Sequence, residues 1–276
     1  MYPFIHLGPI TLGTYGLLVA TGVLVALFVM RADFVRRGLA AVDAEAVVAI
    51  TAFSGMVGAR IYHLMESPRE FFADPWPLLF STMGFAWFGS VIAGFVALVL
   101  LARHYKIGML TMLDAASPAA ALGYGIGRIG CLISGDGDYG KPTNLPWGMS
   151  FPNGIVPTTQ RVHPTPIYEF LIALAIFWIL WRVGGRAIRA ARAAGIVFAA
   201  YLILTGVARF LIEFIRINPR SFFGMTNAQA ASLVSILAGA LLWWSVRGAG
   251  EGQSNPGSRS TSARGGKKRS RSRARA

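Results

Sequence analysis

The sequence carries little charge. Only 14% of its 276 residues are Asp, Glu, Lys or Arg, whereas 54% are hydrophobic and the mean hydropathy is +0.54. A soluble domain usually has about a quarter of its residues charged. Several apolar stretches approach the ~20 residues that a helix needs to cross the hydrocarbon core of a bilayer. The composition therefore excludes an ordinary soluble enzyme and predicts an all-α polytopic membrane protein.

Several common functional motifs are also missing. Cys131 is the single cysteine, so no internal disulfide can form. No H-x-x-x-H or C-x-x-C spacing occurs, and we therefore expect neither a metal nor a cofactor. The absence of G-x-S-x-G leaves a serine hydrolase without its usual signal. No internal repeat is evident, which gives an inverted-repeat transporter no support.

The positive charge is concentrated near the C-terminus. The net charge is +14, and residues 249–276 hold eight Lys or Arg against Glu251 alone. This Ser/Gly/Arg-rich composition predicts a disordered basic cytoplasmic tail over 248–276, following a membrane domain over 1–247. Basic residues near anionic lipid each contribute roughly 1 kcal/mol to the attraction between the chain and the membrane surface. Because the rest of the chain lies in lipid, we expect membrane lipids as partners and no nucleic acid.

The hydropathy pattern predicts seven transmembrane helices. They cover roughly residues 12–31, 44–65, 83–102, 109–127, 166–182, 193–215 and 228–246. The first is followed rather than preceded by basic residues, which indicates an uncleaved helix with its N-terminus outside. Basic residues are then more frequent in alternate loops and in the tail. The positive-inside rule thus predicts an outside N-terminus and a cytoplasmic C-terminus.

Two outward loops are unusual. Residues 66–82 mix acids, prolines and aromatics, and residues 128–165 form the longest connection, rich in Gly, Pro, Asn and Thr. A long irregular loop in a compact protein is usually functional. We therefore expect an outward-facing cavity formed beneath irregular loops.

Charged residues stand out within one apolar segment, "GVARFLIEFIR". Arg209, Glu213 and Arg216 are spaced i, i+4 and i+7, which predicts one face of a helix. A charge near mid-membrane costs ~2.5–3.5 kcal/mol on insertion scales. Two interpretations remain open here: Arg209 and Glu213 form a self-neutralising pair that fixes helix packing, or the Arg209 guanidinium faces a polar cavity.

A second arginine lies in "GRIGCLISGDGDYG", at the expected end of the fourth span. Gly123 and Gly127 are spaced for close helix contact, and Arg128 either extends to the interface or faces the same cavity. Two guanidiniums that converge on an outward cavity would bind phosphate oxygens well. The phosphate most abundant at this depth is a phospholipid head group.

Further ionisable and aromatic candidates occur at the same depth. They are Tyr15, Arg60, His63, Glu66, His163, Tyr168 and Glu169. A lone histidine near an interface is often structural, and Tyr15 and Tyr168 also fit an interfacial aromatic belt.

Taken in order, eight short segments resemble one known family. They are "LGP", "YGL", "GARIYH", "FADPWPLLF", "GRIGC", "HPTPIYE", "RFLIEFIR" and "GMTNAQAASL". Together, over roughly residues 7–246, they are similar to the prolipoprotein diacylglyceryl transferases. The resemblance implies transfer of a diacylglyceryl group from phosphatidylglycerol to the lipobox cysteine of precursor proteins in the bacterial inner membrane. It also implies release of glycerol phosphate.

The resemblance assigns roles to particular residues. It implies that Arg128 and Arg209 hold the head-group phosphate and that Glu213 pairs with Arg209. It implies a catalytic role for His163. Tyr15, Glu169 and Arg60 are implied to contact phosphatidylglycerol.

The chain departs from the family pattern at three positions. Phe88 stands where many members carry the histidine of F-H-G-G, Ser90 replaces its second glycine, and Cys131 replaces an asparagine. The base is then His163, His63 or Glu169, or the arginine field alone lowers the pKa of the substrate thiol. Cys131 either forms a covalent intermediate or fills the asparagine site. A non-catalytic, lipid-binding or altered-substrate paralogue remains the alternative function.

Overall fold

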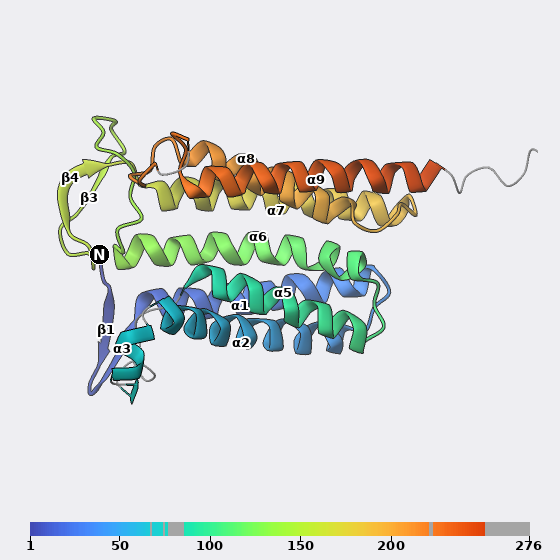
Figure 1. Cartoon of the computed structure of the whole chain (residues 1–276), viewed down its shortest axis with the longest axis horizontal. Helices are drawn as coiled ribbons and strands as arrows, with labels where there is room; N and C mark the ends of the chain where they lie inside the picture. Colours follow the sequence, from blue (N-terminus) through green and yellow to red (C-terminus); the bar gives the residue numbers. More distant parts are fainter. Residues whose placement is uncertain (67, 74, 77–85, 221–222, 252–276) are drawn as a thin grey trace, which may run out of the picture.

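A computed structural model describes residues 1–66, 68–73, 75–76, 86–220 and 223–251 (Figure 1). In these ranges the chain folds into a bundle of long helices that run along its longest axis. They are α1 (Thr14–Arg36), α2 (Ala41–Glu66), α5 (Trp87–His104), α6 (Met109–Ser134), α7 (Thr165–Arg189), α8 (Ile196–Ile212) and α9 (Asn227–Glu251). A short helix, α3 (Pro68–Ala73), follows α2.

The apolar helices confirm the prediction of a helical membrane protein. Four of them, α1, α2, α7 and α9 as far as Arg247, have the length and composition needed to cross a membrane. Shorter apolar helices cover Phe88–His104 and Ile196–Ile212. A 17-residue helix is ~26 Å long, close to the ~30 Å hydrocarbon core. The number of spans and their orientation stay predictions.

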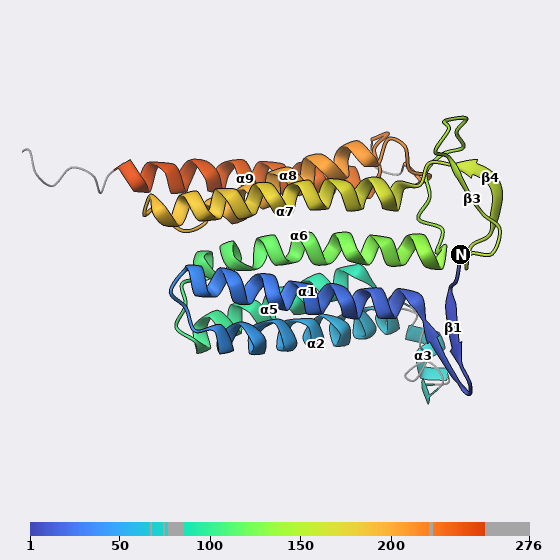
Figure 2. The same cartoon turned by 180° about the vertical axis from the view of Figure 1, so that it is seen from behind.

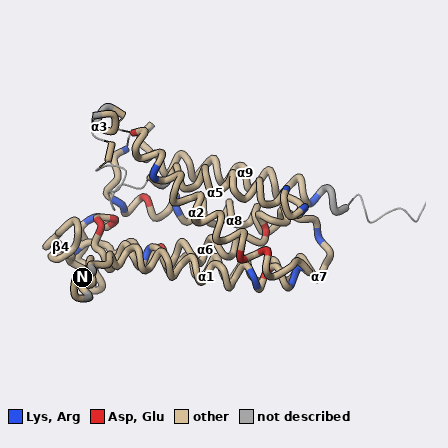
Figure 3. The backbone as a smooth tube through the Cα atoms, turned by 90° about the horizontal axis from the view of Figure 1, so that it is seen from below, with Lys and Arg blue, Asp and Glu red and all other residues tan. Residues whose placement is uncertain are grey.

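The two ends of the bundle differ. The N-terminus, α3 and two antiparallel hairpins lie at one end, called here the hairpin end, whereas α9 finishes at the opposite end (Figures 1 and 2). The hairpins pair β1 (Phe4–Leu7) with β2 (Ile10–Gly13) and β3 (Met149–Phe151) with β4 (Thr158–Val162). Charged residues are concentrated toward both ends of the bundle (Figure 3). These short strands were not predicted from the sequence.

Glycines allow α6 to approach its neighbours closely. A Cβ atom placed on Gly123 would lie 3.3 Å from the Gly22 carbonyl oxygen of α1, and one on Gly130 would lie 3.3 Å from the Tyr15 ring. Gly123 and Gly127 were expected to share one face for close helix contact, but only Gly123 makes this contact, because a Cβ atom on Gly127 would meet open space. Small residues let helix backbones pack closely in a membrane.

The fourth predicted span ends too early. α6 continues past residue 127 as far as Ser134, and it ends where Gly135 adopts a left-handed conformation with φ of 62°. Glycine is common at this position because it has no Cβ atom to clash there. Arg128 therefore projects from a helix, and the long loop begins at residue 135 instead of 128.

The remaining boundaries agree more closely with the sequence. α8 is shorter than the predicted span over 193–215, because Glu213 already caps its C-terminus. α9 runs beyond the predicted 228–246 as far as Glu251, so the first residues of the predicted tail, 248–251, are helical. Residues 252–276 of that tail and much of the loop over 66–82 lie outside the described residues.

Candidate functional site

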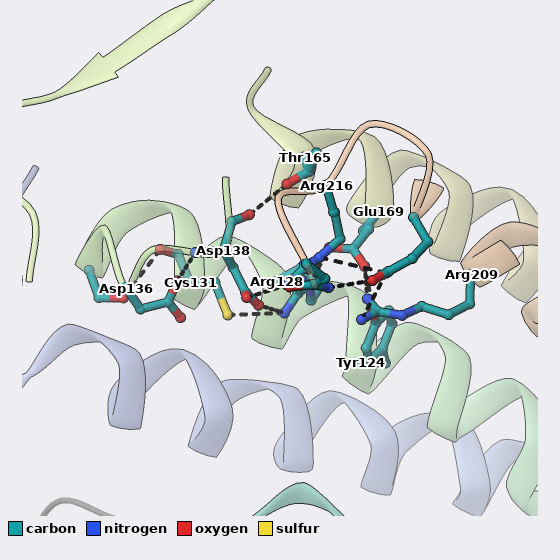
Figure 4. Close-up of polar contacts among 12 residues, drawn as sticks. Tyr124, Arg128, Cys131, Asp136, Asp138, Thr165, Glu169, Arg209 and Arg216 are labelled. Carbon is teal, nitrogen blue, oxygen red and sulfur yellow. Dashed lines mark hydrogen bonds and ion pairs between the residues drawn. The ribbon is translucent and has the colours of Figure 1, made fainter. Parts of the chain in front are cut away.

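A cluster of charged side chains lies toward the hairpin end of α6, α7 and α8 (Figure 4). It is called the hairpin-end cluster here, and its members are Arg128, Asp138, Glu169, Arg209, Glu213 and Arg216. Arg128 on α6 donates from Nε to Glu169 Oε2 over 2.6 Å, and its Nη2 contacts the same oxygen. Its Nη1 donates to Asp138 Oδ2 over 2.6 Å. The Arg128 side chain is only 11% exposed, so it does not extend to the interface.

Three arginines converge on the carboxylate of Glu169, which lies in the first turns of α7. In addition to Arg128, Arg209 of α8 donates from Nη1 to Glu169 Oε1 over 2.9 Å. Arg216 Nη1 lies 3.7 Å from Glu169 Oε2. The Tyr124 hydroxyl donates to Glu169 Oε1 over 2.9 Å. A buried carboxylate thus holds three guanidiniums and one hydroxyl together.

Glu213 joins the two arginines that flank it in sequence. Its Oε2 lies 3.3 Å from Arg209 Nη2 and 3.8 Å from Arg216 Nε, and its side chain is fully buried. The expected pair of Arg209 and Glu213 is therefore present, but it does not neutralise itself in isolation, because Arg209 also binds Glu169. Arg216 follows the end of α8 and forms a β-bridge with Gly140, so a continuous helix face does not place it.

Asp138 closes the cluster from the loop that follows α6. It contacts Arg216 as well as Arg128, and the Thr165 hydroxyl donates to its backbone carbonyl over 2.5 Å. Burial opposes ionisation of Asp138, but attraction by Arg128 and Arg216 is stronger and lowers its pKa. Burial likewise opposes the charge on Arg216, but its hydrogen bond to Asp138 and the attraction of Asp138 and Glu169 together outweigh burial and raise its pKa. This loop contact is thus between two charged groups.

Some polar atoms of the cluster have no hydrogen-bond partner among the described residues. They are Glu213 Oε2, Arg216 Nε and Arg216 Nη1. Arg209 has a side chain that is 32% exposed, and that of Asp138 is 33% exposed. Buried polar groups without a hydrogen-bond partner are uncommon in native proteins. The cluster is therefore partly open, with spare hydrogen-bonding capacity for a polar ligand.

Comparison with known proteins identifies the family. The family model described as prolipoprotein diacylglyceryl transferase matches residues 3–245. The chain belongs to this family. Relatives named phosphatidylglycerol–prolipoprotein diacylglyceryl transferase agree with the match. The relative from Clostridium tetani is 32% identical, covering 82% of this chain and 89% of its own. The relative from Geobacter sulfurreducens is 34% identical, covering 80% and 84%.

In this member of the diacylglyceryl transferase family, His163 lies two residues before the start of α7. Its Nδ1 is 3.3 Å from the Tyr168 hydroxyl, which accepts a hydrogen bond of 2.7 Å from Trp147 Nε1. The Gly140 amide donates to the His163 carbonyl over 2.9 Å. The histidine backbone is thus attached to the loop that carries Asp138, while its ring interacts with Tyr168.

The other residues implied by the family resemblance lie on α1 and α2. Tyr15 packs against Gly130 and is 47% exposed. Arg60 and His63 belong to α2, which packs against α1 and α5, and His63 Nδ1 lies 3.7 Å from Glu66 Oε2. The roles of Tyr15, Arg60 and His63 stay predictions.

Two departures from the family pattern occur at the contact between α2 and α5. The Phe88 ring centroid lies 6.3 Å from that of Tyr62, and Phe88 is 56% exposed. The Ser90 hydroxyl oxygen lies 3.0 Å from the position of a Cβ atom on Gly55. Phe88 has no group that accepts a proton, so it cannot act as the base.

Three residues of the cluster and its surroundings were not predicted from the sequence. Tyr124 is one of them, although it precedes Arg128 by four residues and therefore lies on the same helix face. Arg216 stands out as a charge, but its spacing does not assign it to the site. Asp138 lies in the glycine-rich loop, and no pattern in the sequence shows which arginine it contacts.

Cys131 lies in the same region. Its Sγ is 3.4 Å from Arg128 Nη1, and it gathers with Asp136 and Asp138 closely enough to offer three metal-ligating atoms. Arg128 contacts two of these three groups, and a guanidinium repels a cation. The surroundings of Cys131 are therefore unsuited to a metal ion.

Proposed function

We propose that this protein transfers a diacylglyceryl group from phosphatidylglycerol to the lipobox cysteine thiol of precursor proteins. The observation that carries the proposal is the convergence of three guanidiniums on one buried carboxylate at one end of an apolar helix bundle. Such an arrangement suits a lipid phosphate, because a guanidinium binds two phosphate oxygens at once. Family membership supports the same reaction.

The head-group phosphate binds to Arg128 and Arg209. Arg209 is the more exposed of the two, so the phosphate reaches it first. Glu213 orients Arg209, and Glu169 holds both arginines at a fixed separation through its two oxygens. Tyr15 and Arg60 contact the remainder of the lipid in this proposal.

The thiolate of the precursor attacks the glycerol carbon that carries the phosphodiester oxygen. A carbon–sulfur bond forms, the carbon–oxygen bond breaks, and its electron pair leaves with glycerol phosphate. Negative charge develops on the leaving phosphate as this bond breaks. Arginines that are already held in place stabilise such charge with little reorganisation.

The thiol must first lose its proton, because a free cysteine has a pKa near ~8.5. We propose that His163 accepts this proton. Its backbone is hydrogen-bonded to the loop that carries Asp138. Glu169 is the less suitable base, because three guanidiniums and the Tyr124 hydroxyl already surround its oxygens. His63 lies on α2 beside Glu66.

The same proposal places the protein in the bacterial inner membrane with the hairpin end outward. Arg36, Arg103, Arg186 and Arg247 lie toward the C-terminal ends of helices that finish at the opposite end, as the positive-inside rule requires of a cytoplasmic side. A lipobox cysteine that has crossed the membrane would then meet the cluster on its outward side.

The test is a reconstituted reaction. The purified protein is placed in phosphatidylglycerol vesicles with a lipobox peptide, and the peptide mass is measured. We expect a mass gain of one diacylglyceryl group, and a rate about 10²–10³-fold lower for Arg128→Ala. Arg161→Ala is the matched control, because Arg161 lies at the same end but donates to the carbonyls of residues 145, 146 and 148. Transfer that survives Arg128→Ala would contradict the proposed role of the arginines.

Phe88 and Ser90 favour a second candidate, a lipid-binding paralogue without transferase activity. In that case the peptide would gain no mass, while a family member that carries the F-H-G-G histidine is active in parallel. Lipid binding that depends on Arg128 would then identify the paralogue.

A further inference from the structure

A groove of about 700 Å³ runs between α7 and α9, with α8 as its floor. α8 packs against both neighbours, and the space between those neighbours remains open over the α8 surface. Val183 of α7, Leu204 of α8 and Ala240 of α9 line it, together with Trp243. The lining of the groove is thus almost wholly apolar.

The groove ends in positive charge at the opposite end of the bundle. Arg247 of α9 lines it directly, with its guanidinium carbon 5.3 Å from the centroid of the Trp243 ring. On α7, Arg186 follows Val183 by three residues and therefore projects from the same side of the helix. Both arginines are exposed. An apolar groove thus leads to two guanidiniums near the C-terminal ends of α7 and α9.

We propose that this groove binds one anionic phospholipid from the leaflet at the opposite end. An acyl chain lies along the apolar walls, and the head-group phosphate contacts Arg247 and Arg186. The positive charge of the two arginines favours an anionic lipid over a second copy of this chain. An apolar helix of a second copy would fit the walls but would leave the two guanidiniums without an anion. The site is separate from the hairpin-end cluster, and it does not depend on the transferase reaction.

The test counts lipids on the purified full-length protein. Native mass spectrometry in a nonionic detergent measures binding of dioleoyl phosphatidylserine, with dioleoyl phosphatidylcholine as the neutral probe. We expect the Arg186→Ala/Arg247→Ala variant to bind the anionic lipid about 30-fold more weakly, since each of the two arginines near the surface contributes roughly one kcal/mol to binding. Arg103→Ala is the matched control, because Arg103 is exposed at the same end on α5.

A second variant tests the groove itself. Ala240→Trp fills it while every arginine is kept, and we expect the same loss of one bound anionic lipid. The proposal is overturned if both the double variant and Ala240→Trp bind phosphatidylserine as Arg103→Ala does. Equal binding of the neutral lipid by the unaltered protein also overturns it. A change in the mass of the oligomer with an unchanged lipid count would instead assign the groove to a second copy.

Discussion

Two clusters of buried charge lie at opposite ends of the bundle, and their partners differ. At the end away from the hairpins, Asp33 binds the side chains of Arg36 and Arg37, while Asp114 lies 3.9 Å from Arg37. Asp114 also accepts hydrogen bonds from the backbone amides of Gly195 and Phe198, over 2.9 and 2.8 Å. These four side chains, Asp33, Arg36, Arg37 and Asp114, form what is called here the opposite-end cluster.

Backbone contacts make the opposite-end cluster a structural junction. Arg36 donates to the Trp181 carbonyl over 2.9 Å and lies 3.9 Å above the Trp181 ring. The carboxylates of this cluster are almost fully buried. The hairpin-end cluster instead joins side chains to one another, and Arg209 and Asp138 remain about a third exposed. Charges committed to the backbone hold a fold together, whereas charges that bind each other near a surface can exchange a partner for a ligand.

The largest expected difference between the clusters is in catalysis. Arg209→Ala should lower the rate of diacylglyceryl transfer about 10²–10³-fold and lower the melting temperature less than Arg37→Ala does, because Arg209 is 32% exposed and because Arg128 and Arg216 still contact Glu169 and Glu213. Arg37→Ala should do the reverse, lowering the melting temperature while the folded fraction keeps its transfer rate. Vesicle assays and thermal unfolding in detergent measure both quantities. An inactive but stable Arg37→Ala protein would break the comparison.

The next effect is on stability. Asp33→Ala leaves two guanidiniums at the opposite end without their main partner, and loss of one member of a buried ion pair costs about 3–5 kcal/mol. Glu45→Ala removes a pair with Arg31 in which both side chains are about half exposed, worth roughly 0–1 kcal/mol. Denaturant unfolding in mixed micelles compares the two. A similar loss of unfolding free energy in both variants would show that the buried ion pair stabilises the protein no more than the exposed one.

A smaller effect is expected at the edge of the hairpin-end cluster. Tyr124→Phe removes one hydrogen bond to Glu169, and a hydrogen bond to a charged group is worth about 1.5–3 kcal/mol. We expect transfer to fall roughly tenfold if the hydroxyl fixes the position of this carboxylate. Tyr105→Phe at the opposite end is the control. An unchanged rate for Tyr124→Phe would remove this tyrosine from the site.

The smallest effect is expected at Cys131. We interpret it as a small buried residue that fills the asparagine position, so Cys131→Ala should keep transfer within about twofold of the parent rate. The measurements are the rate and the intact mass of the protein during turnover. A protein-bound diacylglyceryl adduct on the unaltered chain that is absent from the variant would instead reveal a covalent intermediate.

The sequence was sufficient to nominate much of the hairpin-end cluster. Charges such as Arg128 and Arg209 are expensive in an apolar helix, and they therefore stand out among the hydrophobic residues around them. Tyr124 did not stand out, because a tyrosine is ordinary in a membrane helix. The opposite-end cluster was not predicted either, because Asp114 and its partner Gly195 are far apart in the chain and only packing brings them together.

The end of α6 was predicted wrongly for a related reason. The glycines near Arg128 are typical of the start of a loop, but Gly130 fits against Tyr15 of α1, and this contact favours continuation of the helix. Pairing between helices decides such a boundary, and a single sequence does not show it. The short hairpins were not predicted for a different reason. Strands of three to five residues are too short to show a clear alternation of apolar and polar residues.

α6 carries one member of each cluster, Asp114 and Arg128. The number of residues between them is therefore constrained. Asp114 and Arg128 are 14 residues apart on α6, which also contains Pro118, and this spacing corresponds to roughly 21 Å of helix. One residue inserted between them would turn Arg128 by about 100° relative to Asp114. The length of α6 therefore fixes the distance between the two clusters and the direction in which Arg128 projects relative to Asp114.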